Sequence, residues 1–132
     1  MNITAGKILH VDDDESVCTS TSRLLRESGY GIISATNGTD ALELVRGGLY
    51  PDVLMVDFHL GQTNGAEVAE QLRCTLGYAL PIIILTGDVT NARFPHVVEA
   101  FVWLTSKPLD PRLLLAALPN LVQLSRATRI LC

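Results

Sequence analysis

The chain is 132 residues long, and 48% of its residues are hydrophobic while 18% are charged. This length and composition are typical of one globular domain with a single core, and they exclude a disordered chain. The net charge is −4 and there is no basic run or stripe, which argues against direct nucleic-acid binding. We therefore expect a single domain over residues 1–132, with its core at about residues 6–125.

The sequence carries no signal for a membrane or for export. No apolar run approaches the roughly 18 residues that span a bilayer, and the first residues lack the apolar core of a signal peptide. Cys18, Cys74 and Cys132 lie far apart and form no CxxC pair, which is typical of reduced thiols. We expect a cytoplasmic protein with no membrane segment in this stretch.

Five short runs have the residues of buried strands. In residues 53–57, four apolar residues without alternation precede a carboxylate, which indicates a strand buried on both faces of a parallel sheet. The run Ile82–Thr86 is the most β-prone of the chain and favours a central strand. The five predicted strands cover residues 7–11, 31–35, 53–57, 82–86 and 101–105.

Apolar residues at helical spacing predict helices between these strands. The predicted helices cover residues 16–28, 38–46, 66–76 and 90–100, and a last helix begins at Pro111 with Asp110 as its N-cap. Pro95 should shorten or kink the fourth helix, and Pro119 should kink the last one or end it early. Residues 58–65 are expected to form a turn-rich loop.

The order of the predicted elements defines the fold class. Five strands alternate with five helices, and right-handed crossovers place helices on both faces of a parallel sheet. The sequence therefore predicts a doubly wound α/β domain with a five-stranded parallel sheet.

Polar side chains end or follow four of the predicted strands. Asp12 and Asp13 follow the first strand, and Asp57 ends the third. Thr86 ends the fourth strand, and Lys107 follows the fifth. The carboxyl ends of parallel strands meet at one edge of the sheet, where open α/β folds bind ligands. We expect these five residues to form one site.

Three clustered carboxylates stay ionised at neutral pH only if a cation joins them. Oxygen ligands without histidine or cysteine favour Mg²⁺ or Mn²⁺. A carboxylate beside a metal, an ammonium group and a hydroxyl can receive a phosphoryl group, with Asp57 as the nucleophile. Lys107 and the metal would neutralise the negative charge of the phosphoryl oxygens, and Thr86 would donate a hydrogen bond to one of them. Gly87 has no side chain and would leave room for the incoming phosphoryl group. The product, an acyl phosphate, would be a reversible signal.

The chain resembles the receiver domain of two-component response regulators over nearly its whole length. The resemblance rests on Asp12-Asp13, Asp57, Thr86-Gly87 and Lys107-Pro108. It implies a flavodoxin-like fold with strand order 2-1-3-4-5, and a phosphohistidine of a sensor histidine kinase or a phosphotransfer domain as the donor to Asp57. Such a domain catalyses its own phosphorylation and dephosphorylation.

The resemblance also implies residue roles. Mg²⁺ would be bound by Asp13, Asp57 and the backbone carbonyl of His59, while Asp12 would act through water. Thr86 and Lys107 would sense the phosphoryl group, and the Lys107-Pro108 peptide would be cis.

Two positions depart from the family's pattern. Leu104 stands three residues before Lys107, where the family has a switch aromatic, and Gly61 stands where proline is frequent. Residues 85–88 and 106–109 also resemble receivers at the carboxyl end of hybrid histidine kinases. The chain could therefore be a freestanding regulator or a fragment of a hybrid kinase. Histidine kinase activity would be present only in the hybrid kinase. A homodimer also stays open.

Two other functions compete with a phospho-acceptor. A degenerate receiver would only bind a partner, which the missing aromatic favours. A phosphohydrolase of the haloacid-dehalogenase type would use Asp12 as its nucleophile, because Asp12-Asp13-Asp14 contains an Asp-x-Asp. That family needs a further acidic pair after the lysine, where only Asp110 is present, and it leaves Asp57 unexplained.

Five neighbouring residues have simpler structural interpretations. Asp14 and Glu15 cap the helix that follows the first strand. His10 is expected to pack in the core, and Trp103 to be buried or half-buried on its strand. The side chain of His59 is expected to face solvent.

Overall fold

The computed structural model describes residues 5–87, 96–99 and 101–131. Its main sheet has the strand order β2-β1-β3-β6-β8-β7. The first five strands of this order are parallel, and β7 joins β8 in the antiparallel sense. The predicted five-stranded parallel sheet of order 2-1-3-4-5 is thus confirmed. The parallel strands are β1 (Lys7–Val11), β2 (Gly31–Ala35), β3 (Val53–Asp57), β6 (Ile82–Thr86) and β8 (Val102–Ser106).

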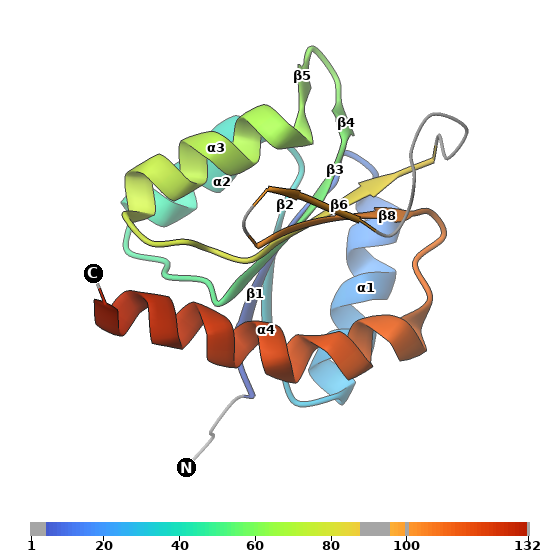
Figure 1. Ribbon diagram of the computed structural model, residues 1–132. Helices are drawn as coiled ribbons and strands as arrows, with labels where there is room; N and C mark the ends of the chain where they lie inside the picture. Colours follow the sequence, from blue (N-terminus) through green and yellow to red (C-terminus); the bar gives the residue numbers. More distant parts are fainter. Residues whose placement is uncertain (1–4, 88–95, 100, 132) are drawn as a thin grey trace.

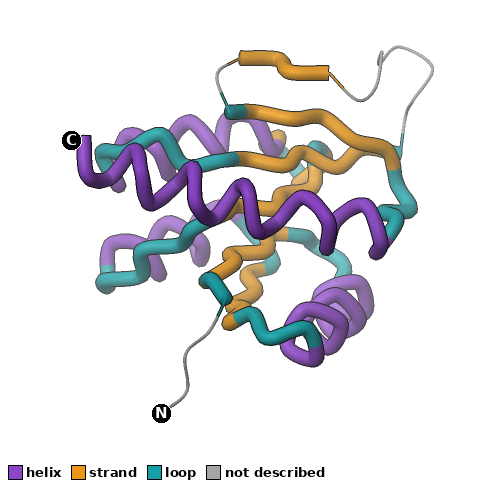
Figure 2. The backbone as a smooth tube through the Cα atoms, turned by 60° about the horizontal axis from the view of Figure 1, so that its bottom comes forward, coloured by secondary structure: helices purple, strands orange, loops and turns teal. Residues whose placement is uncertain are grey.

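Helices cover both faces of this sheet (Figures 1 and 2). One face carries α1 and α4, and the other carries α2 and α3. Each face has its own apolar cluster, and β3 and β6 are buried along their whole length between them. The described helices are α1 (Glu15–Glu27), α2 (Gly38–Arg46), α3 (Gly65–Leu76) and α4 (Pro111–Leu131).

Side chains cap the starts of α2, α3 and α4; the cap at Asp110 is the predicted one, and α3 begins one residue before its predicted start at residue 66. Asn37 and Asn64 accept hydrogen bonds from backbone N–H groups of α2 and α3, and Asp110 accepts one from Arg112 in α4. At the other end of α3, Gly77 has a φ of 80°, the left-handed conformation that ends many helices.

The loop after β3 contains a short hairpin. Two-residue strands β4 (His59–Leu60) and β5 (Thr63–Asn64) pair in the antiparallel sense. Gly61 turns between them with a φ of 65°. The sequence predicted a turn-rich connection here and missed these two small strands.

The prediction of a helix over residues 90–100 is wrong where the structure describes that segment. Residues 96–99 form β7 (His96–Glu99), while residues 90–95 and 100 lie outside the described part of the chain. Pro95 immediately precedes this strand, and Val97 and Val98 are β-branched residues that favour extended backbone. Four helices, rather than five, are therefore present among the described residues.

Of the two expectations for Pro119, a kink or an early end of the last helix, the early end is wrong. α4 continues through this residue to Leu131. Leu121 and Val122 follow the proline and are buried in the cluster on this face of the sheet. Their packing outweighs the hydrogen bond that the proline cannot donate.

The last turns of α4 are joined to the amino-terminal edge of the sheet. Asp52, which is buried just before β3, lies 2.9 Å from Arg129 and 3.4 Å from Arg126. The same carboxylate accepts a hydrogen bond of 2.9 Å from the backbone N–H of Lys7 at the start of β1. One carboxylate therefore links the start of β1, the start of β3 and the end of the chain's last helix.

Tyr78 completes this cluster. Its hydroxyl donates to the backbone carbonyl of Pro51 at 2.6 Å, and the Arg129 guanidinium lies 4.5 Å from the centre of its ring. Burial raises the pKa of Tyr78 to about 12. The phenol is thus held in its neutral, hydrogen-bonded form.

None of the helices in the described part of the chain is long and apolar enough to cross a membrane.

Candidate functional site

The predicted acidic residues meet at the carboxyl edge of the sheet. β1 leads into Asp12 and Asp13, and the adjacent strand β3 ends on Asp57. Asp12 has no exposed surface and Asp57 has 6%, whereas Asp13 is exposed. One carboxylate oxygen from each of the three lies within 4.8 Å of the others. Three oxygens at this spacing suit a hard divalent cation.

Lys107 places its ammonium group between the two buried carboxylates. Its Nζ lies 2.9 Å from Oδ2 of Asp57 and 3.3 Å from Oδ2 of Asp12. Partial burial of Lys107 opposes its charge, but the hydrogen bond to Asp57 and the charge of Asp12 raise its pKa above the ordinary value. Lys107 therefore remains a cation that balances part of the acidic charge.

The neighbouring strand end positions Lys107. Its backbone N–H donates to the carbonyl of Thr86 at 2.8 Å, which continues the parallel pairing of β6 with β8. Thr86 itself is buried, and the cis Lys107-Pro108 peptide that the resemblance implies is present. Next to Thr86, a Cβ atom at Gly87 would have no atom of the described residues within 4 Å.

Gly65 supports Asp57 from behind, a role that the sequence analysis missed. A Cβ atom at Gly65 would lie 2.5 Å from the backbone oxygen of Asp57 and 3.2 Å from the Cα of Phe58. The N–H of Gly65 donates to the carbonyl of Phe58 at 2.7 Å, so the loop closes tightly on the end of β3. The sequence predicts only that Asn64 and Gly65 belong to a turn-rich loop, and it does not indicate this close approach of two backbone segments.

Asp12 and Asp14 have distinct roles. The second oxygen of Asp12 accepts the backbone N–H of Asp14 at 2.9 Å, which fixes the buried carboxylate. Asp14 caps α1 by accepting the N–H groups of Ser16 and Val17, and the hydrogen bonds from Ser16 lower its pKa. The predicted capping role of Asp14 is confirmed.

The two histidines near the site have opposite environments. His59 is exposed, and its backbone N–H points to Asp57 Oδ1 at 3.3 Å. His10 has no exposed surface, as predicted, and burial lowers its pKa. Neither ring nitrogen of His10 has a hydrogen-bond partner in the described part of the chain.

Trp103 and Leu104 lie on opposite faces of β8. Trp103 packs partly buried against the cluster under α1 and α4, and Leu104 packs against the cluster under α2 and α3. Successive side chains alternate between the two faces of a strand, which accounts for this arrangement. The expected half-buried position of Trp103 is confirmed.

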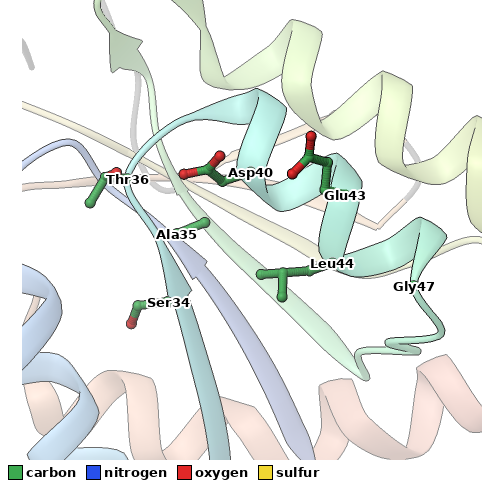
Figure 3. A pocket seen from close by; sticks show the side chains of 7 residues that line it. All are labelled: Ser34, Ala35, Thr36, Asp40, Glu43, Leu44 and Gly47. Atoms are coloured by element: carbon green, nitrogen blue, oxygen red, sulfur yellow. The ribbon is translucent and has the colours of Figure 1, made fainter.

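A separate hollow of about 550 Å³ lies between β2 and α2 (Figure 3). Its charged side chains are Asp40 and Glu43, both exposed on α2. The lining contains neither Asp57 nor Lys107. This hollow is therefore distinct from the acidic edge.

A parallel sheet of this order with an acidic cluster at its carboxyl edge is typical of a flavodoxin-like domain of the receiver class. The family model "Response regulator receiver domain" matches residues 8–119. The chain therefore belongs to the response regulator receiver domain family, whose members serve as phospho-acceptors in two-component signalling.

Individual relatives agree with this assignment. The chain is 44% identical over 81 residues to "Response regulator MprA" of Mycobacterium leprae (strain TN), a match that covers 61% of this chain and 35% of that protein. The match thus spans about a third of the length of that curated relative.

Solved structures give the same fold. The N-terminal domain of a response regulator/sensory box/GGDEF 3-domain protein from Carboxydothermus hydrogenoformans has a TM-score of 0.75 at 28% identity, covering 92% of this chain and 97% of that one. The receiver domain of the hybrid histidine kinase CckA has a TM-score of 0.73 at 26% identity, covering 89% of this chain and 99% of that one.

Proposed function

We propose that this domain accepts a phosphoryl group on Asp57 from a phosphohistidine of a sensor histidine kinase or a phosphotransfer domain. The observation that carries the proposal is the arrangement around Asp57, whose Oδ2 lies 2.9 Å from the Lys107 ammonium. Asp12 and Asp13 contribute oxygens within 4.8 Å of it. The modified domain would signal to a partner or an adjoining domain.

The acidic cluster fits a magnesium or manganese ion. Its donors are carboxylate oxygens, and neither histidine nor cysteine belongs to the group of three. Asp13 and Asp57, with the backbone carbonyl of His59, would hold the ion, and Asp12 would act through water. When bound, the ion supplies positive charge against the phosphoryl oxygens.

The side chains of this chain would carry the transfer itself. A carboxylate oxygen of Asp57 forms a bond to phosphorus while the bond from phosphorus to the donor histidine nitrogen breaks, and that nitrogen keeps the electron pair. Lys107 donates to one phosphoryl oxygen and the Thr86 hydroxyl to another. Attack of water on phosphorus later releases phosphate and restores Asp57. The domain thus catalyses its own phosphorylation and dephosphorylation.

One observation favours a second candidate, a module that binds a partner without being phosphorylated. Leu104 replaces the switch aromatic that the family resemblance implies, and it packs against the apolar cluster under α2 and α3. Such a domain would keep the acidic residues and form no acyl phosphate.

Intact mass after incubation with acetyl phosphate and Mg²⁺ separates the two candidates. Wild type should gain the mass of one phosphoryl group, and Asp57→Asn should gain none. Asp40→Asn is the matched control, because Asp40 is an exposed carboxylate outside the acidic cluster. If wild type forms no adduct and also fails to bind beryllofluoride, the phospho-acceptor function is wrong and the binding module stands.

Lys107→Gln tests the role of the ammonium group. Removing a donor to developing phosphoryl charge typically costs about 10²- to 10³-fold in rate, so adduct formation should slow by that order. Lys7→Gln is the control, because the exposed Lys7 begins β1, at the other end of the strand from the acidic cluster. Equal adduct rates for Lys107→Gln and wild type would contradict this role.

A further inference from the structure

We propose that the outer edge of β2 binds an extended segment of a partner protein in which basic residues alternate with uncharged ones. The segment would add a strand to the main sheet, and its basic side chains would reach the hollow between β2 and α2 (Figure 3). In the strand order of the described residues, β2 is the last strand on this side of the sheet and pairs with β1.

Ser34 presents a backbone donor and a backbone acceptor at this edge. The carbonyl of the next residue, Ala35, accepts the N–H of Asp12 at 3.1 Å, so the backbone groups of Ala35 face β1. Successive residues of a strand point these groups to opposite sides, and those of Ser34 therefore face away from β1. Neither has a hydrogen-bond partner in the described part of the chain.

The strand is accessible and unprotected. Ile33 and Ser34, in the second half of β2, are both exposed. Edge strands are commonly protected from pairing by a charged residue or a proline, and β2 contains neither. An extended chain is the ligand whose own N–H and C=O groups are spaced to meet those of a strand. The free backbone groups of Ser34 therefore identify the occupant as an extended segment.

The hollow beside the strand sets the charge of that segment. Asp40 and Glu43 line it from α2, and none of the described residues that line it is basic. Figure 3 shows both carboxylates on α2, across the hollow from Ser34 and Ala35. A lysine or arginine of the segment would pair with these carboxylates, while its apolar stem packs against Leu44 in the same hollow.

The two faces of β2 explain why only every second residue should be basic. Ile33 pairs with Leu9, which belongs to the cluster under α2 and α3, so Ile33 lies on the face of the carboxylates. Ser34 lies on the other face, where its hydroxyl is 3.1 Å from that of Ser22 in α1. A hollow on that face is lined by Arg26, whose charge disfavours a second basic residue.

Binding at this edge does not depend on the acceptor site. Neither Asp57 nor Lys107 lines the hollows on the two faces of β2. The proposal can therefore be tested on the full chain without metal or phosphoryl donor. Its failure would leave the proposed function untouched.

The test uses a capped peptide of four Lys-Thr repeats and the ¹⁵N-labelled chain. Titration should give a saturable shift of the Ser34 amide signal, and hydrogen exchange at this amide should slow. The matched peptide of four Glu-Thr repeats should bind at least about fivefold more weakly, because it loses the ion pairs with the two carboxylates.

N-methylated peptides test for strand pairing on the wild-type chain. In an added strand, the N–H groups of alternate residues point to β2 and the others point to solvent. N-methylation of all the lysines or of all the threonines should therefore abolish binding in one case and leave it nearly unchanged in the other.

Two pairs of variants locate the surface. Ser34→Pro removes the outward N–H and should lose binding, whereas Ser34→Ala keeps that N–H and should bind like wild type. Glu43→Gln should weaken binding about two- to fivefold, as one surface ion pair provides. Glu70→Gln is its control, because Glu70 is an exposed carboxylate on α3 outside the hollow. Thermal unfolding shows that each variant is folded.

Four outcomes would overturn the proposal. They are the absence of a saturable Ser34 shift, equal affinity for the Lys-Thr and Glu-Thr peptides, equal effects of the two sets of N-methyl groups, and equal binding by folded Ser34→Pro and Ser34→Ala. A fifth outcome would assign the edge to a different occupant. If exchange at Ser34 slows with rising concentration of the free chain, a second copy pairs with β2 and the proposed partner segment is wrong.

Discussion

Gly65 shows how one missing side chain supports the acceptor site. The loop after β3 returns so closely that the nearest atoms to an added Cβ are backbone atoms of Asp57 and Phe58, at 2.5 to 3.2 Å. Backbone atoms cannot rotate away as the end of a long side chain can. The position of the Asp57 peptide therefore depends on glycine at this point.

We predict that Gly65→Ala destabilises the domain by about 1 to 3 kcal/mol, the usual cost of overpacking, and slows adduct formation on Asp57. Urea unfolding and intact mass measure the two effects. Gly47→Ala is the control, because Gly47 has an ordinary φ of −78° and an added Cβ would lie 3.3 Å from Glu43 O. A Gly65→Ala protein as stable as Gly47→Ala would contradict this prediction.

The site residues differ in how visible they are in the sequence. Asp57, Thr86 and Lys107 each stand directly at or after a predicted strand, so the parallel topology alone brings them to one edge. Gly65 has no such signal, because its role depends on a contact with a backbone that only the folded loop creates. The ion pair of Lys107 with both buried carboxylates could likewise be recognised only from the three-dimensional structure.

At the scale of elements, α4 shows packing overriding a local signal. Pro119 lies inside the helix and is exposed, while Leu118 before it and Leu121 after it are buried against the sheet. The apolar spacing on either side of the proline keeps the helix in register with the sheet. Local propensity alone predicts a kink or an early end, and the tertiary contacts keep the helix from ending here.

Pro119→Ala should stabilise the domain by about 1 to 3 kcal/mol, because alanine restores a backbone donor and removes the steric conflict of proline inside a helix. Urea unfolding checks this. Pro111→Ala is the matched control, since proline is well tolerated at the first helical position and its replacement should not stabilise. Equal changes in the free energy of unfolding at the two positions would show that Pro119 does not destabilise the helix.

At β7, the alternation of strands and helices along the chain gives a wrong prediction. The pattern of strands and helices favours a helix before β8, which Pro95 is expected to shorten or kink. The described residues that follow this proline instead add an antiparallel strand to β8. The paired residues are only three to eight positions apart, from Glu99 with Val102 to His96 with Leu104, so β7 and β8 form a local hairpin. The expected alternation of strands and helices along the chain concealed this hairpin.

At the scale of the whole molecule, the cluster around Asp52 joins the two ends of the chain. The carboxylate contacts the amino-terminal strand through Lys7 N and the last helix through Arg129. Tyr78 adds a phenol whose pKa is raised to about 12 by burial. Because an unfolded tyrosine ionises near pH 10, the folded state binds more protons than the unfolded state between pH 10 and 12.

The stability that Tyr78 contributes should therefore be fully present below pH 10 and should be lost as the pH rises toward 12. We predict that Tyr78→Phe is less stable than wild type by about 1 kcal/mol near neutral pH, since the hydrogen bond to Pro51 is lost. The difference should shrink above pH 10. Urea unfolding of both proteins at several pH values measures it, and a constant difference across this range would contradict the assignment.

The ion pairs of Lys107 also have a consequence for the order of events during synthesis. Lys107 follows Asp57 by 50 residues and Asp12 by 95, and a ribosome releases the amino-terminal part of a chain first. Until Lys107 emerges, β1 and β3 can close only by burying two carboxylates without their ammonium partner, a situation that typically costs about 3 to 5 kcal/mol. A nascent chain that stalls before this lysine should therefore stay open and accessible to proteases, so that a competent acceptor exists only once the last strand has been made.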